Sequence, residues 1–221
     1  MQAVLPKKEI KFNFIDNVVA YSDTIKPQLD NNYLFEDINF NEIFGNNNSV
    51  NIEIGIGNGG FISHYALQNP NENFLGFEVF KKILRKAVKK VEKLKLKNVR
   101  LIHYDAKFFV KRFKNESVKT FYVNFPDPWP KKRHHKRRLL KTDFIELMRD
   151  KLMPGGTIFM VTDHRDYAME IVENLKPVEG IVSAFDKAYL NELVDYYETK
   201  YYLKFAVNTG VYFFKYIKSN D

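Results

Sequence analysis

The feature that most constrains the fold is an alternation of short apolar runs with longer amphipathic segments. It begins at residue 50 and continues for more than half of the chain. Five runs have the length and composition of buried strands: residues 50–54, 74–79, 99–104, 118–125 and 157–162. Helices are predicted between or after them, over residues 61–68, 80–94, 140–152 and 164–175. Strands and helices that alternate at this spacing form parallel sheets with helices on both faces.

The C-terminal region follows a different pattern. The segments "KYYLKFAV" and "VYFFKYI" flank "NTG", which predicts an antiparallel hairpin. The expected fold class is therefore α/β and Rossmann-like, with a mostly parallel seven-stranded sheet that ends in an antiparallel hairpin. Residues 50–221 are expected to form this domain. Residues 1–49 are predicted to be an irregular or helical extension that packs on it, so that the chain is one compact domain.

Composition narrows the function classes. The chain has 221 residues, a length typical of one domain, and a net charge of +8. Such an excess of positive charge favours polyanionic partners such as nucleic acid. There is no cysteine, which excludes disulfides, thiolate metal sites and every mechanism that needs a cysteine nucleophile.

Neither a membrane segment nor a metal site is expected. The first residues lack the apolar stretch of a signal peptide, and no apolar run reaches about 18 residues. The cytoplasm is therefore the predicted location. His134 and His135 are adjacent but lack a spaced acid or third histidine, so no metal is predicted there.

A glycine-rich loop follows the first predicted strand. In "EIGIGNGG", Gly55, Gly57 and Gly60 match the G-x-G-x-x-G spacing of nucleotide-binding loops. Glycines there permit a tight turn and let the backbone approach a nucleotide closely. The match alone is weak, because an ordinary strand-to-helix turn also uses glycines.

Three acids at strand ends specify the ligand further. Glu53 ends the first strand, Glu78 closes the second and Asp105 follows the third. Ligands bind at the carboxyl ends of parallel strands, so the three would share one crevice. A carboxylate at Glu53 disfavours a pyrophosphate and suits a cationic amino-acid group. Together they predict S-adenosylmethionine, with its ammonium near Glu53, its ribose on Glu78 and its adenine near Asp105. Each acid alone could equally be a helix cap or a solvated loop residue.

The fourth strand ends in "NFPDPWPKKRHHKRR". Asp127 lies between Pro126 and Pro128, whose fixed backbone angles restrict the turn. Six Lys or Arg and two His follow at once. Basic side chains contact phosphates and position a nucleic acid without reading its sequence. Trp129 either packs the turn or stacks on a base, and a solvated loop is the alternative for the basic run.

At these residues the sequence resembles the tRNA (guanine-N7)-methyltransferases. The resemblance covers roughly residues 50–205 and is based on "EIGIGNGG", "GFEV", "YDA", "FPDPWPKKRHHKRR", "PGGTIFMVTDHRDYA" and "TKYY". It implies methylation of guanine N7 at tRNA position 46, in the variable loop, with S-adenosylmethionine as cofactor. It implies that Asp127 is the catalytic residue. The cofactor-binding residues it implies are Glu53, Gly55, Gly57, Glu78, Asp105 and Asp127. The implied substrate-binding residues are Lys131, Asp163, Thr199, Lys200, Tyr201 and Tyr202. The implied RNA-binding residues are Arg133, His134, His135, Lys136, Arg137 and Arg138.

The chemistry agrees with this assignment. Guanine N7 has a free lone pair and loses no proton on methylation, so no strong general base is needed. Methyl transfer needs in-line positioning, and a fixed carboxylate favours the positive charge that develops on the ring. Asp127 is therefore assigned to orientation and electrostatics. Asp163 is a second candidate for the guanine edge, and also a candidate N-cap of the helix over 164–175.

One departure from the family pattern concerns the C-terminal motif. The family commonly has Thr-Lys-Phe-Glu, whereas this chain has Tyr202 at the position of the acid. Glu198 lies nearby in sequence. The alternatives are a methyltransferase of an exocyclic base amine and a non-catalytic RNA-binding module; a nicotinamide dehydrogenase is third, and Glu53 argues against it. The predicted assembly is a monomer or a homodimer.

Overall fold

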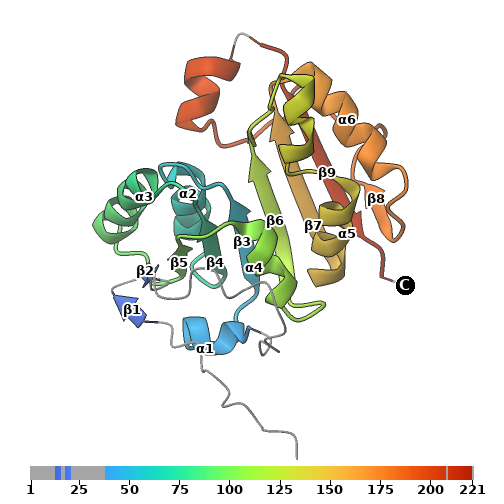
Figure 1. Cartoon of the computed structure of the whole chain (residues 1–221). Helices are drawn as coiled ribbons and strands as arrows, with labels where there is room; N and C mark the ends of the chain where they lie inside the picture. The colour runs from blue at the N-terminus through green and yellow to red at the C-terminus, as the bar shows by residue number, and fades with distance from the viewer. Residues whose placement is uncertain (1–12, 16–17, 21–37, 208, 221) are drawn as a thin grey trace, which may run out of the picture.

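The computed structural model describes residues 13–15, 18–20, 38–207 and 209–220. These residues form one nine-stranded sheet in the order β1-β2-β5-β4-β3-β6-β7-β9-β8, with helices on both faces (Figure 1). The strands are β1 (Asn13–Ile15), β2 (Val18–Ala20), β3 (Val50–Ile54), β4 (Asn73–Phe77), β5 (Val99–Ile102), β6 (Val118–Asn124), β7 (Leu152–Thr162), β8 (Ile181–Ser183) and β9 (Tyr212–Lys218).

The helices that connect these strands cover the sheet. The α-helices are α1 (Phe40–Phe44), α2 (Gly60–Gln68), α3 (Lys81–Lys93), α4 (Ala106–Phe109), α5 (Thr142–Lys151) and α6 (Arg165–Leu175). Two 3-10 helices, η3 (Val110–Arg112) and η4 (Lys132–Arg137), and one π-helical turn, η5 (Tyr202–Ala206), complete the set. The strands β5, β4, β3, β6 and β7 run parallel to one another, whereas β9 is antiparallel to both β7 and β8.

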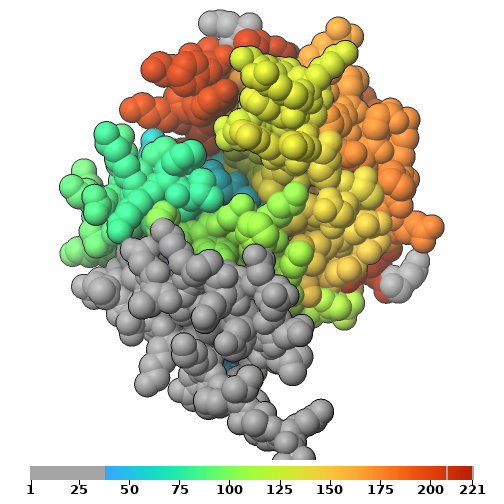
Figure 2. Space-filling model, viewed as in Figure 1, coloured from blue at the N-terminus to red at the C-terminus, as the bar shows by residue number. Residues whose placement is uncertain are grey.

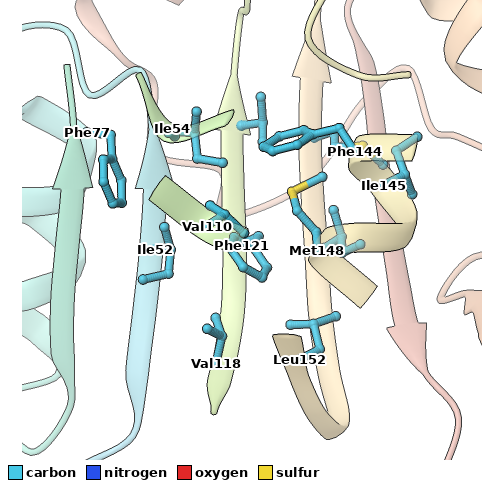
Figure 3. Close-up of a cluster of buried hydrophobic side chains, with 14 of the residues drawn as sticks. Ile52, Ile54, Phe77, Val110, Val118, Phe121, Phe144, Ile145, Met148 and Leu152 are labelled. Atoms are coloured by element: carbon cyan, nitrogen blue, oxygen red, sulfur yellow. The ribbon is translucent and has the colours of Figure 1, made fainter. Parts of the chain in front are cut away.

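Each face of the sheet has its own buried cluster. On one face, side chains of α1, α4, α5 and α6 pack on β3, β4, β6 and β7. Figure 3 shows the part of this cluster in which α5 packs on the strands. Phe121 and Met148, both fully buried, lie at the centre of this cluster. On the other face, α2 and α3 pack on β4 and β5. Since β3 is central and buried at all five positions, its end is well inside the molecule.

The predicted α/β fold is confirmed. The seven strands β3 to β9 form a mostly parallel sheet with an antiparallel end, and β1 and β2 extend it beyond β5. The two added strands lie in residues 1–49, where only irregular or helical structure was predicted. Residues 1–12, 16–17 and 21–37 lie outside the described residues, and the division of the chain at residue 49 stays a prediction.

The predicted C-terminal hairpin is wrong in its first half. Residues 202–206 form the turn η5, and the Thr199 hydroxyl accepts the Tyr202 N–H at its start at 3.1 Å. The second half is β9, as predicted, but its two edges are already paired with β7 and β8. No edge is left for a strand at residues 200–207, which is why the apolar pattern there misled the prediction.

Two helix boundaries also differ from the prediction. The "PGG" segment after α5 lies inside β7, where the pairing register with β6 shifts between Val118 and Thr120. Asp163 is not the N-cap of α6. That position is taken by His164, whose Nδ1 accepts the Tyr167 N–H at 3.3 Å. The carboxylate of Asp163 is thus available to another partner.

Candidate active site

The glycine loop joins β3 to α2 and is held by the end of β4. Gly55 and Gly57 have φ of 79° and 54°, which side chains rarely tolerate. The carboxylate of Glu78 accepts the Gly57 N–H at 3.0 Å and the Phe80 N–H at 2.9 Å. Glu78 is buried and therefore fixes both the loop and the start of α3. Its oxygens have further lone pairs, so a ribose hydroxyl can still donate to them.

Glu53 is a buried acid with an unused oxygen. Its side chain is 3% exposed. Oε1 accepts a hydrogen bond from Asn124 Nδ2 at 3.3 Å, whereas Oε2 has no partner among the described residues. Burial raises the pKa of Glu53 to about 8, although the hydrogen bond from Asn124 and the nearby backbone of Ile62 oppose the shift. A buried carboxylate with one unpartnered oxygen fits a cationic ligand group. An ammonium would supply both a positive charge beside the carboxylate and the missing hydrogen bond to Oε2.

A hydrogen-bonded chain that the sequence did not reveal extends from Glu53. The Tyr196 hydroxyl donates to Asn124 Oδ1 at 3.2 Å, and the Asn124 amide donates to Glu53. Tyr196 is one of several tyrosines in residues 189–202, and no sequence motif distinguishes it from the others. The Tyr196 ring also packs on Tyr202 and Phe213. Tyr196 therefore connects the end of β3 with the segment predicted to bind the substrate.

Asp105, which was predicted to lie near the adenine, has a structural role. It is exposed and caps α4 by accepting the Lys107 N–H at 2.9 Å. The ends of β4 and β5 are adjacent there, since His103 Nε2 lies 3.0 Å from the Val79 carbonyl. Val79 and Phe108 are apolar and more than half exposed. An aromatic base would find both apolar surface and an acid at this edge.

Asp127 lies exposed beyond the end of β6. Phe125 and Trp129 flank it with φ of 49° and 43°, so the turn combines two left-handed residues with two prolines. The Phe125 ring packs on Tyr201 at 4.9 Å. Burial raises the pKa of Tyr201, and the nearby carboxylates of Asp163 and Asp127 raise it further. Tyr201 thus lies close to both acids.

The ends of β6 and β7 meet the 199–202 segment at this point. The Tyr201 hydroxyl donates to Asp163 Oδ2 at 3.2 Å. Lys200 is exposed, and the Thr199 hydroxyl accepts the Tyr202 N–H. Glu198 and Tyr202 both line a hollow of about 250 Å³, together with Tyr196 and Phe213. Asp127, Asp163 and Tyr201 do not line this hollow.

The basic run forms η4, directly after the Asp127 turn. Lys131 to Arg133, Lys136 and Arg137 are exposed, and His134 and His135 are partly buried. The Arg137 guanidinium lies 4.9 Å from the centre of the Trp129 ring, and His134 meets the same ring edge-on. Of its two predicted roles, packing of the turn and stacking on a base, Trp129 has the first in this structure.

Arg138 is not an RNA-facing residue. Its side chain is fully buried, donating to the Pro128 carbonyl at 2.7 Å, to Asp166 at 2.7 Å and to Glu170. It also lies over the Tyr167 ring. The hydrogen bond from Arg138 holds the pKa of Asp166 below its usual value. The expected RNA contact is wrong for this residue, because its charge is satisfied within the protein and fastens the Asp127 turn to α6.

The sequence predicted neither a metal site nor a membrane segment. Within the described residues, no group of three or more histidine, cysteine or acidic side chains could hold a metal ion. None of the helices in that part of the chain is long and apolar enough to cross a membrane.

Comparison with solved structures identifies the fold. The fold is similar to an rRNA methylase from Streptococcus thermophilus, with a TM-score of 0.53 and 17% identity over 79% of this chain and 89% of that one. It is also similar to "a putative methyltransferase from Streptococcus mutans in complex with SAH", with a TM-score of 0.53, 17% identity and coverage of 77% and 89%. The fold is that of the S-adenosylmethionine-dependent methyltransferases.

Sequence comparison is more specific. Residues 47–214 match the family model described as "Putative methyltransferase". A tRNA (guanine-N(7)-)-methyltransferase of Geobacter metallireducens is 38% identical over 81% of this chain and 86% of its own length. That of Bacillus subtilis is 44% identical over 57% of this chain and 59% of its own length, and that of Thermotoga maritima is matched over 56% of its length. The chain spans less than two thirds of these last two relatives. The chain belongs to the tRNA (guanine-N7)-methyltransferase family.

Proposed function

We propose that the protein transfers a methyl group from S-adenosylmethionine to N7 of a guanine in tRNA, at position 46 of the variable loop. The observation that supports this most directly is Glu53, a buried acid with an unpartnered oxygen at the end of the central strand. The names of the curated relatives support the same activity. A tRNA substrate is consistent with the cytoplasm, which is the location predicted from the sequence.

The cofactor would supply an electrophilic methyl group on a positively charged sulfur. Glu53 would hold its ammonium, Glu78 its ribose and Asp105 the adenine amino group. Gly57 would let the backbone approach the ligand closely, since its φ of 54° is strained for any residue with a side chain. Asn124 and Tyr196 would orient the Glu53 carboxylate through their hydrogen bonds.

On the substrate side, Asp127 would orient the guanine. Its exposed carboxylate can accept from the N1–H and the amino group of the base while positive charge develops on the ring. Asp163, held by Tyr201, is the second acid within reach of that edge. Because N7 releases no proton, neither acid acts as a general base. Lys131, Lys200 and the exposed cations of η4 would contact tRNA phosphates.

Labelled methyl transfer from S-adenosylmethionine into unmodified tRNA, followed by nucleoside analysis, tests this function. We expect label in 7-methylguanosine alone. Label in an exocyclic amine would favour the alternative methyltransferase activity. Cofactor binding without any transfer into a competent tRNA would favour the non-catalytic RNA-binding module.

Neutralisation of η4 should weaken tRNA binding. In the triple variant Arg133→Gln, Lys136→Gln, Arg137→Gln, we expect a higher Kd for tRNA and a shallower salt dependence. The slope of log K against log salt should decrease by roughly 2 to 3, because each phosphate contact contributes about 0.7 to 0.9. Filter binding over a salt series measures this. An unchanged slope would mean that the run is a solvated loop.

The Glu53→Gln variant should reverse a pH-dependent loss of stability in the cofactor-free protein. The pKa of Glu53 is raised from 4.5 to about 8 on folding. The stabilisation is fully present below about pH 4.5, where Glu53 is neutral in both the unfolded and the folded state. It is lost as pH rises from there through about 8, at about 1.4 kcal/mol per pH unit. We expect the Tm of the variant, relative to wild type, to rise between about pH 5 and about pH 9.

The control for this measurement is Glu92→Gln, because Glu92 is an exposed acid on α3. Its Tm difference from wild type should be nearly constant over the same range. A Tm difference for Glu53→Gln that is equally constant would show that Glu53 is ionised in the folded protein at all these pH values.

A further inference from the structure

The helix α3 presents a dense array of positive charge outside the candidate active site and outside η4. Its buried face consists of Leu84, Ala87 and Val91. Seven cations occupy the rest of the helix and define what we call the α3 basic face: Lys81, Lys82, Arg85, Lys86, Lys89, Lys90 and Lys93. All are exposed except Lys90, which is partly buried. The helix has one acid, Glu92.

This arrangement costs stability in the free protein. Lys81, Arg85, Lys89 and Lys93 follow one another at i,i+4 spacing, where each like-charged pair is unfavourable by about 0.2 to 0.5 kcal/mol. The first turn of α3 contains no acid, and its N-cap makes no side-chain hydrogen bond, so two lysines oppose the helix dipole. Among the described residues, none of the seven cations forms an ion pair. Local rules of this kind are typically broken at functional sites.

The helix also lies directly beside the candidate active site. Gly59, at the start of α2, approaches α3 so closely that a Cβ there would lie 2.7 Å from the Ala87 Cβ. The ammonium of Lys90 lies 3.5 Å from the position of a Cβ on Gly60. Burial lowers the pKa of Lys90, and the charge of Lys200 lowers it further. The α3 basic face therefore adjoins both the glycine loop and the 199–202 segment.

The two basic surfaces lie on different sides of the site. α3 follows β4, whereas η4 follows β6 and is fastened to α6 through Arg138. In the sheet order, β3 lies between β4 and β6. In Figure 2, residues 81–93 lie at the left and residues 130–138 at the top, with the 200–207 segment next to both.

We propose that the α3 basic face is a second phosphate-binding surface for the tRNA, on the side of the active site opposite η4. This rests on the proposed function and extends it to how the substrate is held. The face is about 18 Å long, at 1.5 Å per helical residue, enough to follow several phosphates. With contacts on two sides, the tRNA would be fixed in position and orientation before the guanine reaches Asp127.

The test uses the full chain with four substitutions on α3: Lys82→Gln, Lys86→Gln, Lys89→Gln and Lys93→Gln. A matched variant removes the same charge elsewhere, at four exposed lysines: Lys114→Gln, Lys176→Gln, Lys187→Gln and Lys215→Gln. The Kd for unmodified tRNA is measured by filter binding over a salt series, and KM and kcat for tRNA by methyl transfer. Thermal melting without RNA checks folding.

We expect the α3 variant to raise the Kd for tRNA about tenfold or more near physiological salt. Its salt slope should fall by about 3, at 0.7 to 0.9 per phosphate contact. KM should rise, kcat at saturating tRNA should stay unchanged, and the Tm without RNA should be equal or higher because like charges are removed. The matched variant should change the Kd by much less.

Equal effects of the two variants on Kd and slope would overturn the proposal, since net charge alone would then explain them. So would an α3 variant whose tRNA affinity is that of wild type. Because binding is measured separately from methyl transfer, a failure of the α3 basic face is distinguishable from a failure of the proposed activity, which would show as absent 7-methylguanosine in wild type.

Discussion

The Asp127→Asn variant is expected to lose methyl transfer by about 10²- to 10³-fold in kcat, the range seen when one preorganised electrostatic contact is removed from an active site. Asparagine keeps the shape of the side chain but removes the charge. Its amide also presents donors to the N1–H and amino group of guanine, which are donors themselves. The measurement is single-turnover transfer into unmodified tRNA at saturating cofactor.

Cofactor affinity is the accompanying control. Calorimetric titration of Asp127→Asn with S-adenosylmethionine should give a Kd within a few-fold of wild type, because Glu53, Glu78 and the glycine loop are untouched. Asp163→Asn, one strand away and bonded to Tyr201, is the comparison variant and should lose less. Near-normal turnover of Asp127→Asn would show that this carboxylate has no part in the reaction.

The Arg138→Met variant is expected to be severely destabilised. Removing one partner from a buried ion pair costs about 3 to 5 kcal/mol. Glu170 Oε2 and the Pro128 carbonyl each lose a donor, and only Glu170 Oε1 keeps one, from Lys141. At about 2 to 4 °C per kcal/mol for a chain of this size, Tm should fall by roughly 6 to 20 °C. Differential scanning calorimetry measures this directly.

Arg137→Met is the matched control, one residue away in the same basic run. Arg137 is exposed and contacts the Trp129 ring, so its replacement should leave Tm within about 1 to 2 °C while weakening tRNA binding. The opposite pattern, a stable Arg138→Met protein with reduced tRNA affinity, would contradict the buried position of Arg138 and restore its assignment to RNA.

The parts of the fold that follow from local periodicity were predictable. β3 matches its predicted bounds because its five residues are apolar or buried and the glycines end it sharply. The start of α3 was predictable from the change to helical period after Phe80. The positions of Glu53, Glu78 and Asp127 at the ends of strands were predictable, because strand ends in a parallel sheet meet at one edge.

Features that depend on tertiary contacts were not predictable. Arg138 is one of six basic residues in a run, and only the distant acids of α6 distinguish it from Arg137. Residues 202–206 have a strand-like pattern but find no free edge on β9. The hydrogen bond from Tyr196 to Asn124 joins residues 72 positions apart, a separation that no motif reports.

The chain of hydrogen bonds from Glu53 through Asn124 to Tyr196 has a thermodynamic consequence. Tyr196 is three residues from Thr199 and packs on Tyr202, so a ligand at Glu53 that moves Tyr196 also changes the surface offered to the base. Linkage is reciprocal: the factor by which cofactor alters tRNA affinity equals the factor by which tRNA alters cofactor affinity. The coupling between the two ligands would then pass through one amide that lies between a carboxylate and a phenol.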